Sequence, residues 1–573
     1  MSISAWRGGA IALLSLASLL SGCAEQPMRA PDAFRLTRLF PLEHDTTPVF
    51  DDVITASPLL YGKDGARQVL LPVSNGEVAA IDALSGALRW RVTMPCPHEL
   101  KAVIAATPVI VAPRLFVAYQ CTDGVTGRKH HFLAALDLPR QRLDENWPVI
   151  ELQAELPSSD GRGTVQFDPP HAFSRAALQH TVPVGSELGY VYVAFGNAGD
   201  VQPYHGWLFE IDLDAWQRGE MGRVTRAVMT TTPEQECPVT QPYGTREMIC
   251  AGGIWTPAGP LVDERGTRST LFVPTGNGQV DLKRRDYGNA LLRIEPGLVF
   301  DPGCDEALCR DFNPSDPSFA CLASCRHLFI PRPAPDDPPL RPADGECDER
   351  TFWDCLAWMD YDLGANTPVN ITLDDGRTVL VQPGKEGGVY LIDADHLGRQ
   401  YDRLQIVNVC GTPQDECKLH WRGMIVTQPV ATHVNGDPIV VVPTFMSDTS
   451  QPAGLIALKI VLVEGQPKLQ RFWQVPDPHS PEAVKTFRAH PSYPLLHHWQ
   501  GKEPYVWVVD VGNPGDIYGV RVRDGRRVAH ALLKGTGRPL ARLLLDGDRL
   551  YVTSNAPGKK TAWLEAYRIE AVD

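Results

Sequence analysis

Cysteines are the residues of this chain whose number and spacing most directly allow chemistry, because thiols form disulfides and thiolates bind metal ions. The sequence contains 13 cysteines, and none lies in a CxxC or CxxCH motif, so covalent haem attachment is not indicated. Close spacing predicts disulfides that staple hairpins or loops for three pairs: Cys96/Cys121, Cys237/Cys250 and Cys410/Cys417. Six more cysteines occupy a Pro- and Asp-rich stretch, where disulfides are favoured over a metal cluster: Cys304, Cys309, Cys321, Cys325, Cys347 and Cys355.

Other motifs for catalysis are absent or weak. The sequence has no GxSxG, HExxH, Walker A or EF-hand pattern. The histidine pairs at 130–131 and 497–498 could bind copper or zinc, but exposed loop positions are the favoured interpretation. Simple hydrolase, zinc-protease and nucleotide-binding chemistry is therefore not indicated.

The N-terminus has the features of a secretory signal. Arg7 precedes the apolar run "AIALLSLASLL", which is too short to span a bilayer. The following "LSGC" resembles a bacterial lipobox, which implies removal of residues 1–22, a lipid on Cys23 and a tether over 23–49. Ala24 implies sorting to the outer membrane, facing the periplasm or the cell surface. Lipid anchoring leaves the rest of the chain soluble, and the even number of remaining cysteines suits a compartment that permits disulfides.

Composition limits the classes of function. The net charge is −14 and no cluster of Lys or Arg occurs, which argues against binding of nucleic acid. Gly and Pro are spread along the chain, as expected for many short strands and turns. No second apolar run is long enough for a transmembrane helix.

A repeat organises the chain. The stretch "NGEVAAIDALSGALRW" (75–90) joins an alternating strand to a turn and a returning Trp, and a second strand lies upstream of it. Looser versions recur at 131–138, 206–216, 288–297, 387–398, 453–460, 515–528 and 562–571. Eight such units with almost no helical periodicity predict an all-β fold, an eight-bladed β-propeller whose last strand near 570 pairs beside the first near 50.

The blade pattern resembles the tryptophan-docking repeat of the pyrroloquinoline quinone (PQQ) enzymes, over roughly residues 50 to 570. This resemblance implies a quinoprotein-type propeller over 50–573, with the cysteine-rich stretch at about 300–357 as an insertion. The segments "YVAFG", "PYHGW", "GGIW", "TGNG" and "DYG" are most similar to uncharacterised secreted PQQ-repeat proteins. An outer-membrane assembly-factor lipoprotein shares the fold without a cofactor, so the fold alone does not decide the function.

The resemblance also implies roles for six residues. Trp255 matches the residue on which the quinone stacks, and Asn277 matches a calcium ligand. One of Asp360 and Asp362 matches the catalytic, metal-binding aspartate. Lys385 matches the cation beside the quinone oxygens. At the position of the family's third calcium ligand, a Glu, this chain has Asp200 at best.

Two functions remain open from the sequence. The order of these residues favours a PQQ- and Ca²⁺-dependent oxidoreductase acting on an alcohol or sugar, with a separate electron acceptor because no haem motif is present. The missing Glu and the missing Cys–Cys pair that covers the quinone in many relatives favour a non-catalytic scaffold in the cell envelope. Such a scaffold would bind a protein partner by adding a strand at an exposed blade edge.

Overall fold

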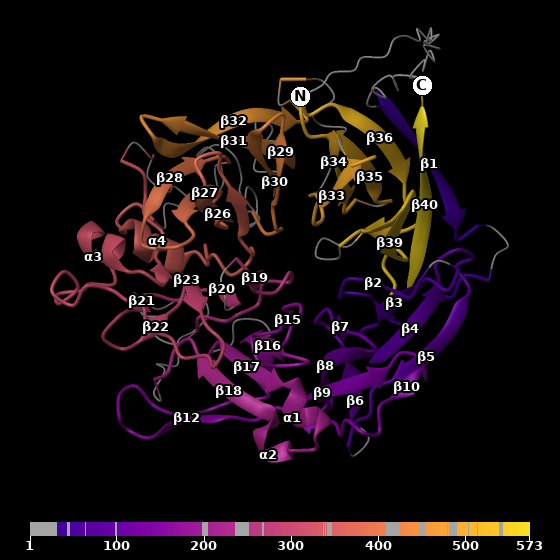
Figure 1. Ribbon diagram of the computed structural model, residues 1–573, viewed down its shortest axis with the longest axis horizontal. Coiled ribbons are helices and arrows are strands. Elements are labelled where there is room, and N and C mark those ends of the chain that lie inside the picture. The colour runs from indigo at the N-terminus through magenta and orange to yellow at the C-terminus, as the bar shows by residue number, and fades with distance from the viewer. Residues whose placement is uncertain are drawn as a thin grey trace, which may run out of the picture.

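The computed structural model describes residues 31–572 apart from 43–45, 64, 98–99, 198–203, 235–250, 266–268, 336, 338–339, 341–346, 408–424, 446–452, 478, 481–486, 488–489, 502, 513 and 538–541. Over these residues the chain forms a closed ring of eight small antiparallel sheets around a central axis (Figure 1). The predicted eight-bladed β-propeller is therefore confirmed. Each sheet is called a blade and is numbered in chain order.

The first four blades follow one another from residue 59. Blade 1 contains β2 (Leu59–Tyr61), β3 (Gln68–Pro72), β4 (Glu77–Asp82) and β5 (Leu88–Thr93). Blade 2 contains β7 (Val109–Val111), β8 (Arg114–Thr122), β9 (Lys129–Asp137) and β10 (Arg142–Leu143), with β6 (Lys101–Val103) and β11 (Ile150–Glu151) added. Blade 3 contains β15 (Gln179–Thr181), β16 (Tyr190–Asn197), β17 (Trp207–Asp212) and β18 (Thr225–Thr230), with β14 (Ala172–Phe173) added. Blade 4 contains β19 (Leu261–Asp263), β20 (Thr270–Pro274), β23 (Leu291–Ile294) and β24 (Leu328–Phe329).

The last four blades complete the ring. Blade 5 contains β25 (Val369–Thr372), β26 (Thr378–Pro383), β27 (Gly388–Asp393) and β28 (Gln400–Gln405). Blade 6 contains β29 (Val430–Val434), β30 (Asp437–Thr444), β31 (Gly454–Val463) and β32 (Gln466–Val475). Blade 7 contains β33 (Leu495–Trp499), β34 (Glu503–Asp510), β35 (Asp516–Arg521) and β36 (Arg527–Leu532). Blade 8 contains β38 (Leu544–Asp546), β39 (Arg549–Asn555), β40 (Ala562–Val572) and β1 (Ala33–Phe40), with β37 (Thr536–Gly537) added.

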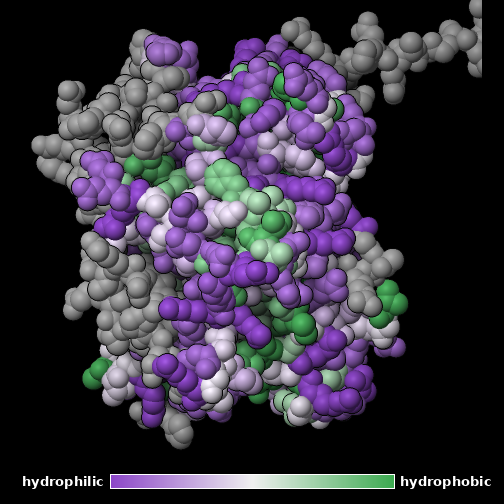
Figure 2. Space-filling model, turned by 90° about the vertical axis from the view of Figure 1, so that its left-hand side faces the viewer, coloured by the Kyte–Doolittle hydropathy of each residue, from purple (hydrophilic) through white to green (hydrophobic). Residues whose placement is uncertain are grey.

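Smaller elements lie in the connections between these strands. The described helices are short: α1 (Leu213–Gln217), α2 (Met221–Val224), α3 (Phe319–Ser324) and α4 (Phe352–Trp358). Two short hairpins pair β12 (Glu155–Pro157) with β13 (Thr164–Gln166), and β21 (Val280–Asp281) with β22 (Asp286–Tyr287). None of the described helices is long and apolar enough to span a membrane. On the side of the ring that carries α3 and β28 the surface is mainly hydrophilic, with smaller hydrophobic patches (Figure 2).

The turn of the repeat shows why the pattern recurs. Asp82 accepts hydrogen bonds from the backbone amides of Leu84 (3.0 Å) and Ser85 (2.7 Å), which begins the turn after β4. Gly86 follows with φ of 76°, and a Cβ there would lie 2.6 Å from the Phe40 ring of blade 8. Trp90 then packs in the core between blades 1 and 2 and donates to Gln68 (2.9 Å). The turn residues therefore set both the hairpin and the fit between neighbouring blades.

The hydrophobic core is divided among the interfaces between blades. One cluster of buried apolar side chains lies between blades 1 and 2, another between blades 2 and 3, and so on around the ring to blades 8 and 1. Because each blade has apolar side chains on both faces, the blades stabilise one another by burying apolar surface.

The ring closes with strands from both ends of the chain. β1 pairs antiparallel with β40, with Leu36 opposite Ile569. Phe50 then forms a bridge with Ala562, whose carbonyl accepts from the Phe50 amide at 2.8 Å. The prediction placed the first strand near residue 50 and a tether over 23–49; the structure begins the propeller at residue 33. The reason is that β1 is the outermost strand of blade 8, so only its partner from the other end of the chain identifies it.

The cysteine-rich stretch is held by disulfides, as predicted. Cys304 bonds Cys325, Cys309 bonds Cys321, and Cys347 bonds Cys355. These sulfur atoms are thereby used in covalent bonds rather than in a metal cluster. β24 lies within the predicted insertion but forms the outermost strand of blade 4. Cys96 bonds Cys121 as predicted, while the predicted pairs Cys237/Cys250 and Cys410/Cys417 lie outside the described residues.

Candidate functional site

Five of the predicted site residues lie at one end of blades 4 and 5. Trp255 precedes β19 and Asn277 follows β20, while Asp360 and Asp362 precede β25 and Lys385 follows β26. In an antiparallel blade the end of the second strand lies beside the start of the first strand. The fold therefore places all five segments on the same face of the ring. Asp200 and Cys23 lie outside the described residues.

Lys385 is the centre of the contacts among them. Its Nζ lies 2.9 Å from Oδ2 of Asp360 and 3.3 Å from Oδ2 of Asp362. The same Nζ lies 4.8 Å from the centroid of the Trp255 ring, which is a cation–π distance. Lys385 and Asp362 are buried, with side chains 8% and 1% exposed, whereas Asp360 is 36% exposed. The structure thus brings four of the predicted residues into direct contact, with one carboxylate open to solvent.

Asn277 lies on a loop that packs against Trp255. Gly276 comes so close to the indole that a Cβ would lie 2.9 Å from its Nε1, and its amide donates to the Gly253 carbonyl at 2.7 Å. Asn277 is buried, and its side-chain oxygen accepts from the Gly278 amide at 2.9 Å. The loop therefore reaches the site because glycine leaves room for the indole.

Asn289 ties this loop to the segment that carries the aspartates, and sequence reasoning missed it. Its amide donates to the Gly276 carbonyl at 2.7 Å, and its side-chain oxygen accepts from the Leu363 amide at 3.1 Å. Its φ is 50°, a left-handed conformation that Asn tolerates better than most residues. The signal was present in "DYGNALL", where an Asn directly precedes an apolar strand.

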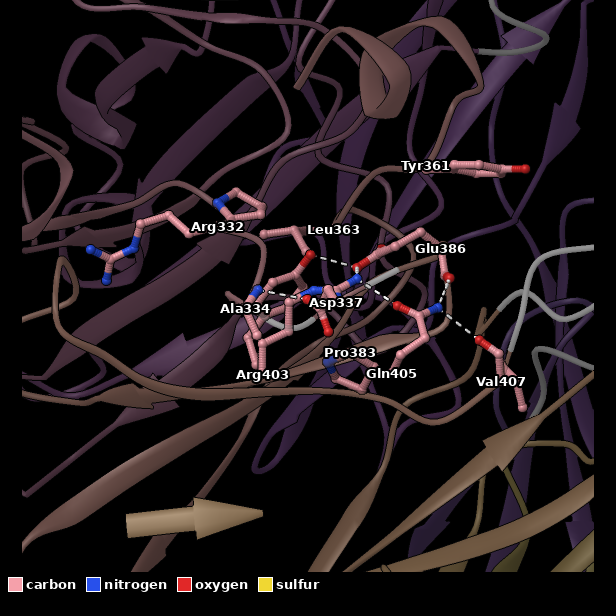
Figure 3. A network of polar contacts seen from close by, with 12 residues as sticks. Arg332, Ala334, Asp337, Tyr361, Leu363, Pro383, Glu386, Arg403, Gln405 and Val407 are labelled. Carbon is pink, nitrogen blue, oxygen red and sulfur yellow. Dashed lines mark hydrogen bonds and ion pairs between the residues drawn. The ribbon is translucent and has the colours of Figure 1, made fainter. Parts of the chain in front are cut away.

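A buried network holds the turn that carries Lys385 (Figure 3). Glu386 is fully buried and lies 3.4 Å from a guanidinium nitrogen of Arg403, which also pairs with Asp337 from the disulfide-rich stretch. Gln405 donates to the Glu386 carbonyl at 2.6 Å and to the Val407 carbonyl at 2.7 Å. Burial raises the pKa of the Glu386 carboxyl, and Arg403 opposes that shift. The network fixes the backbone on the C-terminal side of Lys385.

Two further features border the site. The guanidinium of Arg175 lies 5.7 Å from the Trp255 ring, so a second cation contacts the indole. A cavity of about 580 Å³ lies under the disulfide-rich stretch, lined in part by Arg403, Asp337 and Phe352. Neither feature was predicted, because both join segments that are far apart in the sequence.

The residues present fit the chemistry of a hard cation more directly than that of a stacked quinone. Asp360, Asp362 and Asn277 offer oxygen atoms, the donors that Ca²⁺ prefers, and the Lys385 ammonium already sits among the carboxylates as a resident cation. Trp255 is half-buried, and a planar ligand on the face near Lys385 would have to move that ammonium. The donor set therefore suits a hard cation, and a stacked ligand would require the lysine side chain to turn.

Among solved structures, a methanol dehydrogenase shares the fold of this chain. No protein-family model matches the chain, and no curated protein matches its sequence. A europium-containing methanol dehydrogenase matches with a TM-score of 0.52 and 13% identity, over 94% of this chain and 93% of that one. A quinohemoprotein alcohol dehydrogenase from Comamonas testosteroni matches at 0.47 with 12% identity, over 90% and 75%. BamB from Moraxella catarrhalis matches at 0.41 with 11% identity, over 93% and 98%.

The fold defines the class of the protein: it is an eight-bladed β-propeller of the quinoprotein type. Within that class, its site contains a Lys in contact with a Trp and two Asp, in the chain order predicted from the resemblance to the PQQ-repeat enzymes.

Proposed function

We propose that this protein is an envelope-located oxidoreductase that binds PQQ and Ca²⁺ and oxidises an alcohol or a sugar. The observation that carries the proposal is the contact of Lys385 with Asp360, Asp362 and Trp255 on one face of blades 4 and 5. At 13% identity the methanol dehydrogenase supports the fold alone, so the function rests on this arrangement.

Each residue has a role in the proposed reaction. Bound PQQ would supply the acceptor for the two electrons that leave the substrate carbon. Trp255 would provide a flat surface for stacking, and Lys385 would place positive charge beside the quinone oxygens. Asp360 or Asp362 would accept the proton of the substrate hydroxyl, and Asp360 is the one open to solvent. Asn277 and Asp200 would hold Ca²⁺ together with an aspartate.

The setting of the protein belongs to the same proposal. A lipid on Cys23 would hold the propeller at the outer membrane, with residues 24–32 as the remaining tether before β1. Electrons would leave to a separate acceptor, because the sequence contains no haem-attachment motif.

The test is a thermal-shift titration of the calcium-stripped protein with PQQ, with Ca²⁺, with both and with neither. We expect PQQ to raise the melting temperature only when Ca²⁺ is present, because the carboxylates of PQQ and of the site repel each other without a cation. At a hundredfold excess over Kd, binding adds about 2.7 kcal/mol to the free energy of unfolding.

Matched variants test whether the stabilisation by PQQ with Ca²⁺ arises at the candidate site. Trp255→Ala and Asn277→Ala should lose the stabilisation by PQQ with Ca²⁺. Phe319→Ala and Asn313→Ala remove an exposed aromatic and an exposed amide elsewhere, and both should keep it. A wild-type protein that shows no shift with both ligands would contradict the proposal.

One observation favours the alternative, a non-catalytic scaffold for an envelope protein partner. The ammonium of Lys385 is already paired with two aspartates within the chain, so this lysine has its counter-charge without a cofactor. The outermost strand β5 is exposed along most of its length and offers an edge to which a partner strand could add. Failure of the titration would leave this as the better interpretation.

A further inference from the structure

A second pair of carboxyl groups lies buried between blades 3 and 4. Asp286 is in β22, within the long loop that joins β20 to β23, and Glu234 follows β18. Asp286 is 1% exposed and Glu234 is 7% exposed. Their carboxyl groups lie within hydrogen-bonding reach of each other. The pair therefore joins two blades at a point that the proposed quinone site does not use.

Three oxygen atoms of this pair accept no hydrogen bond from any residue that the structure describes: both carboxylate oxygens of Asp286 and Oε2 of Glu234. Oε1 of Glu234 has a partner, because Nε of Arg284 lies 3.5 Å from it. A buried polar group without a partner costs free energy, and a buried charge without one costs more. The Asp286 carboxyl is thus buried beside another carboxyl, with no hydrogen-bond donor among the described residues.

Glu565, another buried carboxylate of this chain, provides a comparison. Glu565 is 0% exposed, and it accepts hydrogen bonds from two backbone amides and from three side chains. The donors are the amides of Lys534 (2.9 Å) and Gly535 (3.2 Å) and the side chains of Ser554, Trp563 (3.2 Å) and Tyr567 (2.7 Å). Glu565 is satisfied by donors of the protein, whereas Asp286 has no donor among the residues that the structure describes. This contrast, rather than the mere presence of acidic residues, points to a missing ligand.

The charge around the pair indicates the kind of ligand. Three carboxyl groups, those of Glu234, Asp286 and Asp281, face the guanidinium of Arg284, which lies 3.5 Å from Glu234 and 3.6 Å from Asp281. With all three ionised, the net charge of the group is −2, which one divalent cation balances. Bare carboxylate oxygens, including a potentially bidentate aspartate, are the ligands that hard cations such as Ca²⁺ prefer.

We infer that Glu234 and Asp286 bind a divalent cation, Ca²⁺ by the chemistry of the donors, at a structural site separate from Asn277 and Asp362. The ion links the segment that leaves blade 3 to the loop of blade 4 that also carries Asn277. Two hydrogen bonds already hold that loop nearby: the Tyr287 amide donates to the Thr231 carbonyl at 2.9 Å, and Thr275 Oγ1 donates to the Tyr287 carbonyl at 2.6 Å. Of these, the bond to Thr231 joins the two blades, so the ion adds a second link between them and neutralises the buried charge.

The experiment is isothermal titration of the full-length, EDTA-treated protein with CaCl₂ in the absence of PQQ. We expect one calcium site. Asp286→Asn and Glu234→Gln keep the shape of the side chains and should abolish this site. Asn277→Ala should keep it, and so should Asp374→Asn, a control at an exposed turn.

The outcomes separate this inference from the proposed function. If the wild type binds no Ca²⁺, or if Asp286→Asn binds it as the wild type does, the inference is wrong. If the only calcium site is lost in Asn277→Ala and kept in Asp286→Asn, the ion belongs to the proposed quinone site, and this inference fails while that proposal stands. If Asp286→Asn raises the melting temperature and Ca²⁺ changes nothing in the wild type, the pair is a shared-proton contact and the inference is also overturned.

Discussion

At the scale of single residues, Lys385 makes the charged contacts that join the candidate site. Its buried ammonium faces two carboxylates and an indole, so removing it leaves Asp362 buried without its cation. Breaking a buried ion pair from one side is costly because the remaining charge has lost its compensation.

We expect Lys385→Met to lower the free energy of unfolding by about 3–5 kcal/mol in calcium-free buffer. Ca²⁺ should restore part of this loss, because the two aspartates then have a replacement cation. Urea denaturation with and without Ca²⁺ measures both effects. Lys559→Met, on an exposed turn, is the control and should change little. A Lys385→Met protein as stable as that control would show that the ion pairs do not hold the site together.

At the scale of structural elements, Arg403 stabilises the turn between β26 and β27. Arg403 pairs with Glu386 in the turn and with Asp337 in the disulfide-rich stretch, so one guanidinium joins the site to the insertion (Figure 3). The position of Lys385 therefore depends on contacts made by residues that do not enter the site.

We expect Arg403→Met to cost about 3–5 kcal/mol, because Glu386 is then buried without a counter-charge. Glu386→Gln in the same protein should recover part of that loss. A double-mutant cycle by urea denaturation should give a coupling energy of about 0.5–3 kcal/mol. Arg310→Met, an exposed arginine, provides the baseline. Strictly additive losses in the Arg403 and Glu386 variants would show that the two side chains act independently.

At the scale of the whole molecule, stability depends on closing the ring. β1 covers the edge of β40, and Phe34 on β1 packs at 4.8 Å from the Trp499 ring and 5.0 Å from the Tyr505 ring of blade 7. A sheet edge left open invites association with other chains, so β1 protects the propeller as well as stabilising it.

We expect Phe34→Ala to lower the free energy of unfolding by about 3–5 kcal/mol, the usual cost of removing a buried aromatic ring. Phe319→Ala removes a side chain that is 51% exposed and should cost far less. Differential scanning calorimetry compares the two variants. Equal losses of stability in the two variants would show that β1 does not stabilise blade 8. The propeller would then not depend on the pairing of its two ends.

The sequence by itself determined the number and type of the repeats. Alternating strands, an Asp–Gly turn and a returning Trp are local patterns, so "NGEVAAIDALSGALRW" predicted both the hairpin around Gly86 and the packing of Trp90 between blades. The chain order of Trp255, Asp360, Asp362 and Lys385, read through the family resemblance, also placed four residues that the structure brings into contact.

Only the tertiary structure decided which distant segments meet. β1 could not be predicted because its partner strand lies more than 500 residues away, and its own pattern of alternation is weak. The same is true of Arg403 against Asp337 and of Asp286 against Glu234, since the first pair joins blade 5 to the disulfide-rich stretch and the second joins blades 3 and 4. Hairpins follow from the conformational preferences of neighbouring residues, whereas burial and charge pairing between blades arise only after the ring has closed.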